Sequence, residues 1–106
     1  MAVHDYFGIT ITLTANVVTN LLAALRAVDT SVPATAREVT LQNDPASPQA
    51  LFVGDPLVAT STQRCGYQLG LGDSKTYRSS SVQDVPIGRL YLRSTGTAIV
   101  NVEGWC

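Results

Sequence analysis

The clearest pattern in the chain is an unbroken alternation of apolar and polar residues near its start. From Gly8 to Thr14, the aliphatic residues Ile9, Ile11 and Leu13 alternate with threonines. Side chains that alternate in this way lie on opposite faces of a β-strand. The segment therefore predicts a half-buried strand whose three aliphatic side chains face the core.

The apolar residues then change to a helical spacing between Asn16 and Val28. They follow the i, i+3, i+4, i+7 rule of one helix face and are Val17, Val18, Leu21, Leu22, Leu25 and Val28. Alanines between them favour a helix, and Asn16 is a residue type that caps helix N-termini. We predict one short helix here, ended by the linker that contains Pro33.

The rest of the chain consists of short alternating segments separated by turn-forming residues. Each neighbouring pair predicts a β-hairpin, because Gly, Pro, Asn and Asp at the connection favour tight turns. The three predicted hairpins join residues 37–42 to 51–54, 67–71 to 75–78, and 87–94 to 98–105.

This arrangement predicts an all-β fold, a small antiparallel β-sandwich or jelly-roll-like barrel with one short helix after the first strand. A chain of 106 residues has enough material for a single core. We assign residues 8–106 to that domain and residues 1–7 to an N-terminal arm. Tyr6 and Phe7 would be exposed on this arm, so we expect them to pack on the protein's own sheet or on a neighbouring subunit.

The strand within residues 87–94 presents a second candidate contact. If Leu90 and Leu92 face the core, then Arg89, Tyr91 and Arg93 must face outward. Tyrosine and arginine often dominate binding energy at protein interfaces. The stripe predicts a protein contact, and an ordinary solvated sheet face is the alternative.

The composition favours a subunit of a larger assembly over a free monomer, with random codon usage as the alternative source of its excess of arginine over lysine. Charged residues make up 14% of the chain, and the basic ones are six arginines and one lysine. Arginine is enriched and lysine depleted at interfaces, and a surface with few charges costs less to desolvate. The net charge of −1, without a basic cluster, argues against nucleic acid as a partner. Neither a signal peptide nor an apolar run of membrane-spanning length is apparent, so we expect a soluble protein made in a cytoplasm.

Residues that carry chemistry are few and scattered. His4 is the single histidine, and no nucleophile or base is placed beside it by the sequence, so we expect no catalytic site and no cofactor. Turn carboxylates that could meet around a calcium ion lack any ligand spacing, and we predict no metal site; they are Asp44, Asp55 and Asp73. Reduced thiols are the expected state of Cys65 and Cys106.

Several aromatic residues could form a platform that stacks on sugars, although filling the core or lining a subunit contact is the simpler role. They are Phe52, Tyr67, Tyr77, Tyr91 and Trp105.

The order of these segments resembles small β-sandwich virion proteins of tailed bacteriophages. The resemblance spans roughly residues 8–105 and rests on short strings: Val-Thr-Leu-Gln, Val-Gly-Asp and Gly-Asp-Ser, after a Thr-rich strand and a Leu/Ala helix. It implies a non-enzymatic capsid decoration (cement) protein that binds the major capsid protein, forms a homotrimer and resides on the virion surface. A tail, neck or fibre module that binds a receptor or carbohydrate is the alternative. The family has no catalytic motif, so no functional residue is transferred to this chain.

Overall fold

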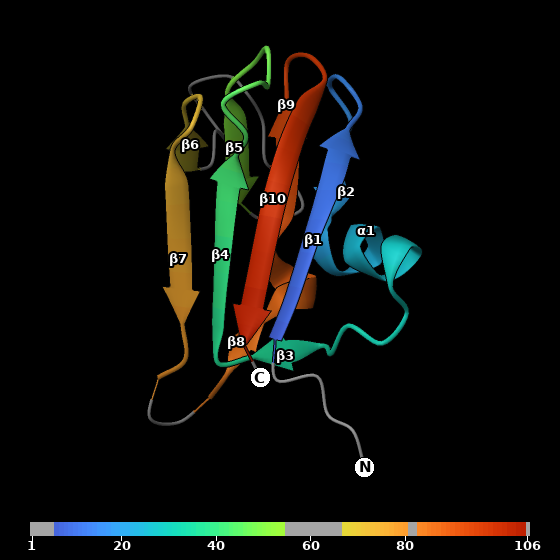
Figure 1. Ribbon diagram of the computed structural model, residues 1–106, viewed down its shortest axis with the longest axis vertical. Coiled ribbons are helices and arrows are strands. Elements are labelled where there is room, and N and C mark those ends of the chain that lie inside the picture. Colours follow the sequence, from blue (N-terminus) through green and yellow to red (C-terminus); the bar gives the residue numbers. More distant parts are fainter. Residues whose placement is uncertain (1–5, 55–66, 81–82, 106) are drawn as a thin grey trace.

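The computed structural model describes residues 6–54, 67–80 and 83–105, and shows two antiparallel sheets packed face to face (Figure 1). The front sheet has the order β1-β10-β4-β7, and the back sheet has the order β2-β9-β5-β6. The front strands are β1 (Tyr6–Leu13), β10 (Ala98–Trp105), β4 (Glu38–Asn43) and β7 (Ser74–Arg78). The back strands are β2 (Thr19–Asn20), β9 (Tyr91–Ser94), β5 (Leu51–Gly54) and β6 (Tyr67–Leu69). The all-β class with one short helix among the described residues, α1 (Leu21–Val28), is confirmed.

A third, two-stranded sheet lies below the two main ones. It pairs β3 (Thr35–Ala36) with β8 (Val85–Pro86), which leads into the 3₁₀-helix η1 (Ile87–Arg89). In the described part of the chain, no helix has the length and apolar composition of a membrane span.

The core forms between the two main sheets because every second side chain of each long strand points inward. Ile11 and Leu13 of β1 are buried as predicted, and Ile9 is half-buried beside them. Leu92 of β9 is fully buried, whereas its neighbours Tyr91 and Arg93 face outward, again as the alternation predicts. The helix α1 closes one side of the sandwich through Leu21 and Leu25.

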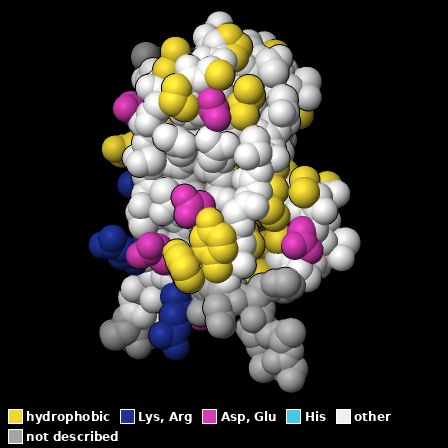
Figure 2. Space-filling model, viewed as in Figure 1, with side chains coloured by type: hydrophobic (Ala, Val, Ile, Leu, Met, Phe, Trp, Pro, Cys, Tyr) yellow, Lys and Arg dark blue, Asp and Glu magenta, His cyan; other side chains and the backbone are white. Residues whose placement is uncertain are grey.

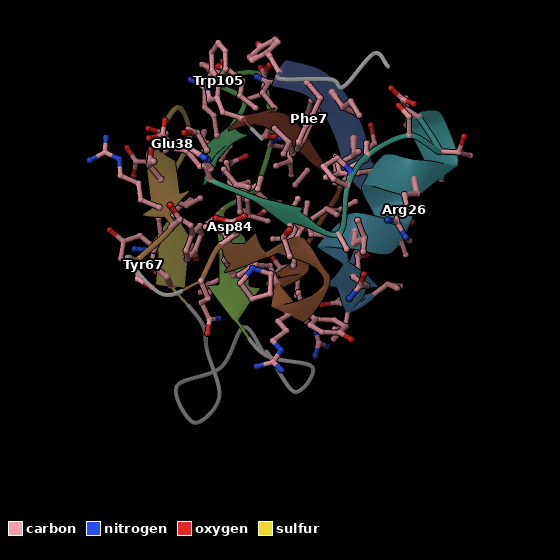
Figure 3. All side chains as sticks on the ribbon, turned by 90° about the horizontal axis from the view of Figure 1, so that it is seen from below. Phe7, Arg26, Glu38, Tyr67, Asp84 and Trp105 are labelled. Atoms are coloured by element: carbon pink, nitrogen blue, oxygen red, sulfur yellow. The ribbon has the colours of Figure 1, made fainter. Side chains whose placement is uncertain are left out.

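The first strand is longer than the sequence pattern suggests. It begins at Tyr6, which pairs with Trp105, and Phe7 pairs with Gly104. The Phe7 side chain is only 6% exposed and points between the sheets (Figure 3), so the placement of Phe7 on an exposed arm is wrong. Gly104 explains the outcome, because a side chain at that position would collide with the Phe7 ring. A glycine opposite an aromatic residue makes room for its ring over the partner strand.

The helix is shorter than predicted and begins at Leu21, with Asn20 as its N-cap instead of Asn16. The Asn20 side-chain oxygen accepts a hydrogen bond of 3.0 Å from the Ala23 backbone N–H. Residues 19–20 form β2 and pair with β9, which holds them in extended backbone. Asn16 lies in the turn before β2, with a φ of 58°.

The three predicted hairpins are all wrong in their pairing. In each case the two strands lie in different sheets: β4 and β5, β6 and β7, and β9 and β10. The connections therefore cross from one sheet to the other over the edge of the core. We call such a connection an arch. Its turn residues and its alternating strands look the same in the sequence as those of a hairpin, because each strand still buries one apolar face in the core.

A buried asparagine ties the end of β4 to the back sheet. The Asn43 side-chain amide donates hydrogen bonds to the carbonyls of Gln49, at 3.0 Å, and Leu69, at 3.1 Å. Its backbone N–H donates to the Asp73 carbonyl, and its carbonyl accepts from the Gly72 N–H. One residue thus joins both connections that cross the sandwich at this end.

The next residue, Asp44, holds the turn that leaves β4. Its carboxylate accepts hydrogen bonds from the Ala46 backbone N–H, at 2.8 Å, and from the Asn101 side chain, at 3.0 Å. The backbone hydrogen bond first, and the Asn101 amide second, lower the pKa of Asp44 below its ordinary value. Asp44 therefore stabilises the turn in its ionised form.

Substituting Asp44 with asparagine should lower the melting temperature at neutral pH but not in strong acid. A carboxyl whose pKa is lowered by folding contributes stability above its unfolded pKa, about 3.9, and loses it as the pH falls through the lower folded value. Melting curves of both proteins between about pH 2 and 7 should therefore converge at the acidic end. A difference that stays constant over this range would show that ionisation of Asp44 is not involved.

Candidate binding surface

The outer face of the front sheet is almost free of charge over most of its area. Its side chains form cross-strand hydrogen bonds from Thr10 to Asn101, from Asn101 to Gln42, and between Thr40 and Thr76, all 2.9–3.1 Å long. These pairs hold the hydroxyl and amide groups in place along the face. Uncharged polar groups of this kind cost less to remove from water than charged groups do when a partner covers them.

Two aromatic side chains stand at the lower end of this face. Tyr6 is 43% exposed and Trp105 is 50% exposed, and their ring centroids lie 4.6 Å apart at an interplanar angle of 53°. The Tyr6 hydroxyl donates a 3.1 Å hydrogen bond to the Glu103 carboxylate, which raises the pKa of Tyr6 together with some burial. Figure 2 shows the resulting apolar patch with acidic and basic side chains beside it. The hydrogen bond and the ring contact fix the orientation of both rings.

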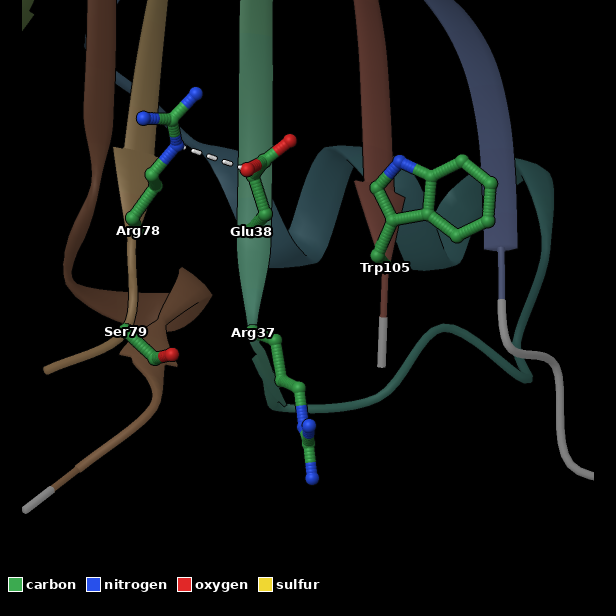
Figure 4. Close-up of a pocket in the computed structure, with 5 residues that line it drawn as sticks. All are labelled: Arg37, Glu38, Arg78, Ser79 and Trp105. Carbon is green, nitrogen blue, oxygen red and sulfur yellow. Dashed lines mark hydrogen bonds and ion pairs between the residues drawn. The ribbon is translucent and has the colours of Figure 1, made fainter. Parts of the chain in front are cut away.

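An open pocket of about 480 Å³ adjoins the Trp105 indole (Figure 4). It is lined by Arg37, Glu38, Arg78, Ser79 and Trp105. Arg78 Nε lies 2.9 Å from Glu38 Oε2, and Arg37 extends away from this ion pair. The backbone fixes the site, because the Arg37 N–H donates to the Trp105 carbonyl and the Arg37 carbonyl accepts from the Ser79 N–H, both at 2.7 Å.

We call Tyr6, Trp105, Glu38 and Arg78 the aromatic end of the front sheet. The four residues share one row, because Tyr6 pairs with Trp105, Trp105 with Glu38, and Glu38 with Arg78. The exposed ion pair contributes little to stability, since water and salt screen it. It offers a planar cationic donor and a carboxylate acceptor next to an apolar ring, a combination suited to binding.

The predicted interface residues do not form one surface. Tyr6 lies on the outer face of the front sheet, and Phe7 lies in the core. Tyr91 and Arg93 face outward from the opposite, back sheet and are half-buried, and Arg93 Nε is buried without a hydrogen-bond partner among the described residues. Arg89 is exposed but belongs to η1, so it does not continue the strand stripe as predicted.

The five residues of the proposed aromatic platform are also spread over the molecule. Tyr67 and Tyr77 line the side between β6 and β7, where Lys75 Nζ lies 4.2 Å and 5.2 Å from their ring centroids. Phe52 lies on the back sheet opposite Arg93, and Tyr91 is on the same strand as Arg93. Trp105 is therefore separated from the other four, and its aromatic neighbour is Tyr6.

Sequence reasoning missed Glu38 and Arg78 and did not connect Tyr6 with Trp105. Tyr6 and Trp105 are nearly a full chain length apart, and only the β1–β10 pairing brings them together. The sequence held a weak indication of this site, because alternation along each strand places both side chains on its outward face.

The described residues contain no group of three His, Cys, Asp or Glu side chains that could hold a metal ion. Asp44 is engaged in its turn, and the Asp73 carboxylate accepts a hydrogen bond from the Gly70 N–H. The remaining candidates for such chemistry lie outside the described residues; they are His4, Asp55, Cys65 and Cys106. No protein-family model, curated protein or solved structure matches this chain.

Proposed function

We propose that the chain is a non-enzymatic structural protein of a tailed-phage virion. In this proposal it is made in the host cytoplasm and decorates the capsid, where it binds the major capsid protein and stabilises the head shell. The supporting observation is the aromatic end, an ordered pair of half-exposed aromatic rings at the border of a nearly uncharged sheet face. The segment order that resembles phage virion proteins supplies the identity of the partner.

The aromatic end has the properties of an interface hot spot. Trp, Tyr and Arg dominate binding energy at protein interfaces, and here Trp105, Tyr6 and Arg78 lie in one row. The hydroxyl and amide rows beside them cost less to desolvate than charged groups and would exclude water around the rings. A decoration protein repeats each such contact by symmetry, so modest single contacts suffice for firm attachment.

Replacing Trp105 with alanine should weaken binding to shells of the cognate major capsid protein by roughly thirtyfold. Truncating a hot-spot aromatic residue typically costs about 2 kcal/mol or more of binding free energy. Co-sedimentation of the variant with purified shells over a concentration series measures this loss. Circular dichroism should show an unchanged fold, because the indole is half-exposed.

Tyr67→Ala is the matched control, since Tyr67 is an equally exposed aromatic residue, 55% against 50%, at the edge of the back sheet. It should bind shells like the parent protein. The same assay on Tyr91→Ala and Arg93→Ala tests the predicted protein contact on the back sheet. Full binding by Trp105→Ala, with loss in the Tyr91 or Arg93 variant, would assign the contact to the back sheet.

A carbohydrate- or receptor-binding module of a tail, neck or fibre is the second candidate. The pocket beside Trp105 favours it, because an exposed indole next to the Glu38–Arg78 pair can stack on a sugar ring and bind its hydroxyl groups. A glycan array probed with the fluorescent protein tests this function directly. Binding to glycans that is lost in Trp105→Ala, without binding to shells, would replace the decoration proposal.

A further inference from the structure

The front sheet has two edges with different protection. Its order places β1 at one edge and β7 at the other (Figure 1). An edge strand presents unpaired backbone N–H and C=O groups, and proteins usually block such edges with charges, prolines or bulges. How each edge is blocked shows whether it is available to another strand.

The β7 edge is blocked by an inward-facing lysine. Lys75 pairs with the buried Leu41, so both side chains point to the same side of the sheet, toward the core. Its ammonium group is placed over the rings of Tyr67 and Tyr77 and fills the side of the sandwich between β7 and β6. A strand added to β7 would have to pack its own inward side chains against this charge. An inward charge on an edge strand is a known device against such pairing.

No residue within β1 supplies a comparable block, although the helix α1 packs beside this edge. All eight residues of Tyr6–Leu13 are uncharged and none is proline, so the edge is about 26 Å of regular strand. Its outward side chains include the exposed Thr10 and Thr12, whereas Ile9 faces inward but stays half-buried. Figure 2 shows hydrophobic side chains between this edge and the helix α1, whose last residue, Val28, is 63% exposed. Unpaired backbone groups and apolar side chains therefore lie next to each other along the β1 edge.

We propose that a second copy of this chain pairs with β1, strand against strand and antiparallel, around a two-fold axis at Thr10. In this register Thr10 lies opposite Thr10 of the other copy, Ile9 lies opposite Ile11, and Gly8 lies opposite Thr12. Apolar residues then meet apolar ones on the core side, Thr10 meets Thr10 on the outer side, and the paired strand residues carry no charge. The pairing forms about six new backbone hydrogen bonds and joins the two front sheets into one of eight strands.

Self-pairing fits this strand better than a different partner does. The strand has no charge that could attract a partner of opposite sign, and its alternation of Ile and Thr is complementary to itself when reversed. The inference does not depend on the capsid proposal. It predicts a dimer of the free protein, a different state from the trimer that the sequence resemblance implies.

Thr10→Lys should disrupt this dimer. In the proposed register the two lysines lie directly opposite each other, which replaces a favourable Thr–Thr pair with like charges. We expect the parent protein to be a dimer by light scattering at tens of micromolar, and the dissociation constant of Thr10→Lys to be about tenfold higher or more. The matched control is Thr76→Lys, at the β7 edge of the same face. Each threonine makes one cross-strand hydrogen bond, to Asn101 or to Thr40, so both variants lose the same kind of contact and only the first should dissociate.

A disulfide trap tests the register without reliance on affinity. In a background in which Cys65 and Cys106 are serine, Thr10→Cys should form a covalent dimer on mild oxidation. Opposed residues of antiparallel strands have Cα atoms about 4.5–5.5 Å apart, within the range that a disulfide spans. Thr12→Cys, which lies opposite Gly8, should stay uncrosslinked. A parent protein that is monomeric up to about 100 µM and whose Thr10→Cys variant does not crosslink would overturn the inference, as would a trimer unaffected by Thr10→Lys.

Discussion

Replacing Phe7 with alanine is expected to lower the free energy of unfolding by about 3–5 kcal/mol, the range measured for large aromatic residues in protein cores. The Phe7 ring is 6% exposed and packs over Gly104, whose missing side chain leaves nothing to fill the space once the ring is gone. In a domain of about 100 residues this loss corresponds to a fall of ~12 °C or more in melting temperature. Differential scanning calorimetry measures both quantities.

Two further variants distinguish a core role of Phe7 from the interpretation of residues 1–7 as an exposed arm. Deleting residues 1–7 removes the same ring and should destabilise the protein at least as much as Phe7→Ala. Tyr6→Ala, which shortens a side chain that is 43% exposed, should cost far less stability. If deletion of residues 1–7 left the melting temperature unchanged, the segment would be the detachable arm that the sequence first suggested.

Asn43→Ala is expected to lower the free energy of unfolding by about 2–4 kcal/mol. The substitution removes two hydrogen bonds and leaves the Leu69 carbonyl, at a buried contact, and the Gln49 carbonyl, at a half-buried one, without this donor. Because these carbonyls belong to segments that lead into β5 and out of β6, the effect should reach the back sheet. Guanidinium denaturation followed by circular dichroism measures the loss.

The neighbouring amide Gln42 provides the control. Gln42→Ala removes a hydrogen bond of similar length to Asn101, but on the solvent-facing side of the same strand. It should therefore change stability by less than about 1 kcal/mol. Equal losses in both variants would mean that the buried position of Asn43 adds nothing to its hydrogen bonds.

The fold class and the inward residues could be predicted from the sequence because alternation is a local property. A strand that buries one face must place apolar residues at every second position, and this requirement identified Ile11, Leu13 and Leu92 correctly. The first residues of the first strand and of the helix were predicted less accurately. Tyr6 and Phe7 look like an arm until Gly104 is known to lie opposite, and Asn20 becomes the helix cap only because the preceding residues pair with β9.

Strand pairing was not predictable, because neither turn residues nor alternation distinguishes a hairpin from an arch. Both connections satisfy a short turn, and both bury the same faces. The choice depends on partners far along the chain, such as β1 with β10. The aromatic end was missed for this reason, since a site shared by Tyr6, Glu38, Arg78 and Trp105 exists only after these long-range pairings are made.

The position of β10 constrains when the protein can fold during synthesis. This strand is the last described in the chain, yet it lies between β1 and β4 in the front sheet and pairs with both. While residues 98–105 are still inside the ribosome, β1 has emerged without a partner on either side, and the Ile- and Thr-rich strand is exposed to other nascent chains. Such long-range closure is slow and leaves strand edges open in the meantime. We therefore expect the front sheet to form only after β10 leaves the exit tunnel, so that β1 stays without a partner strand until then.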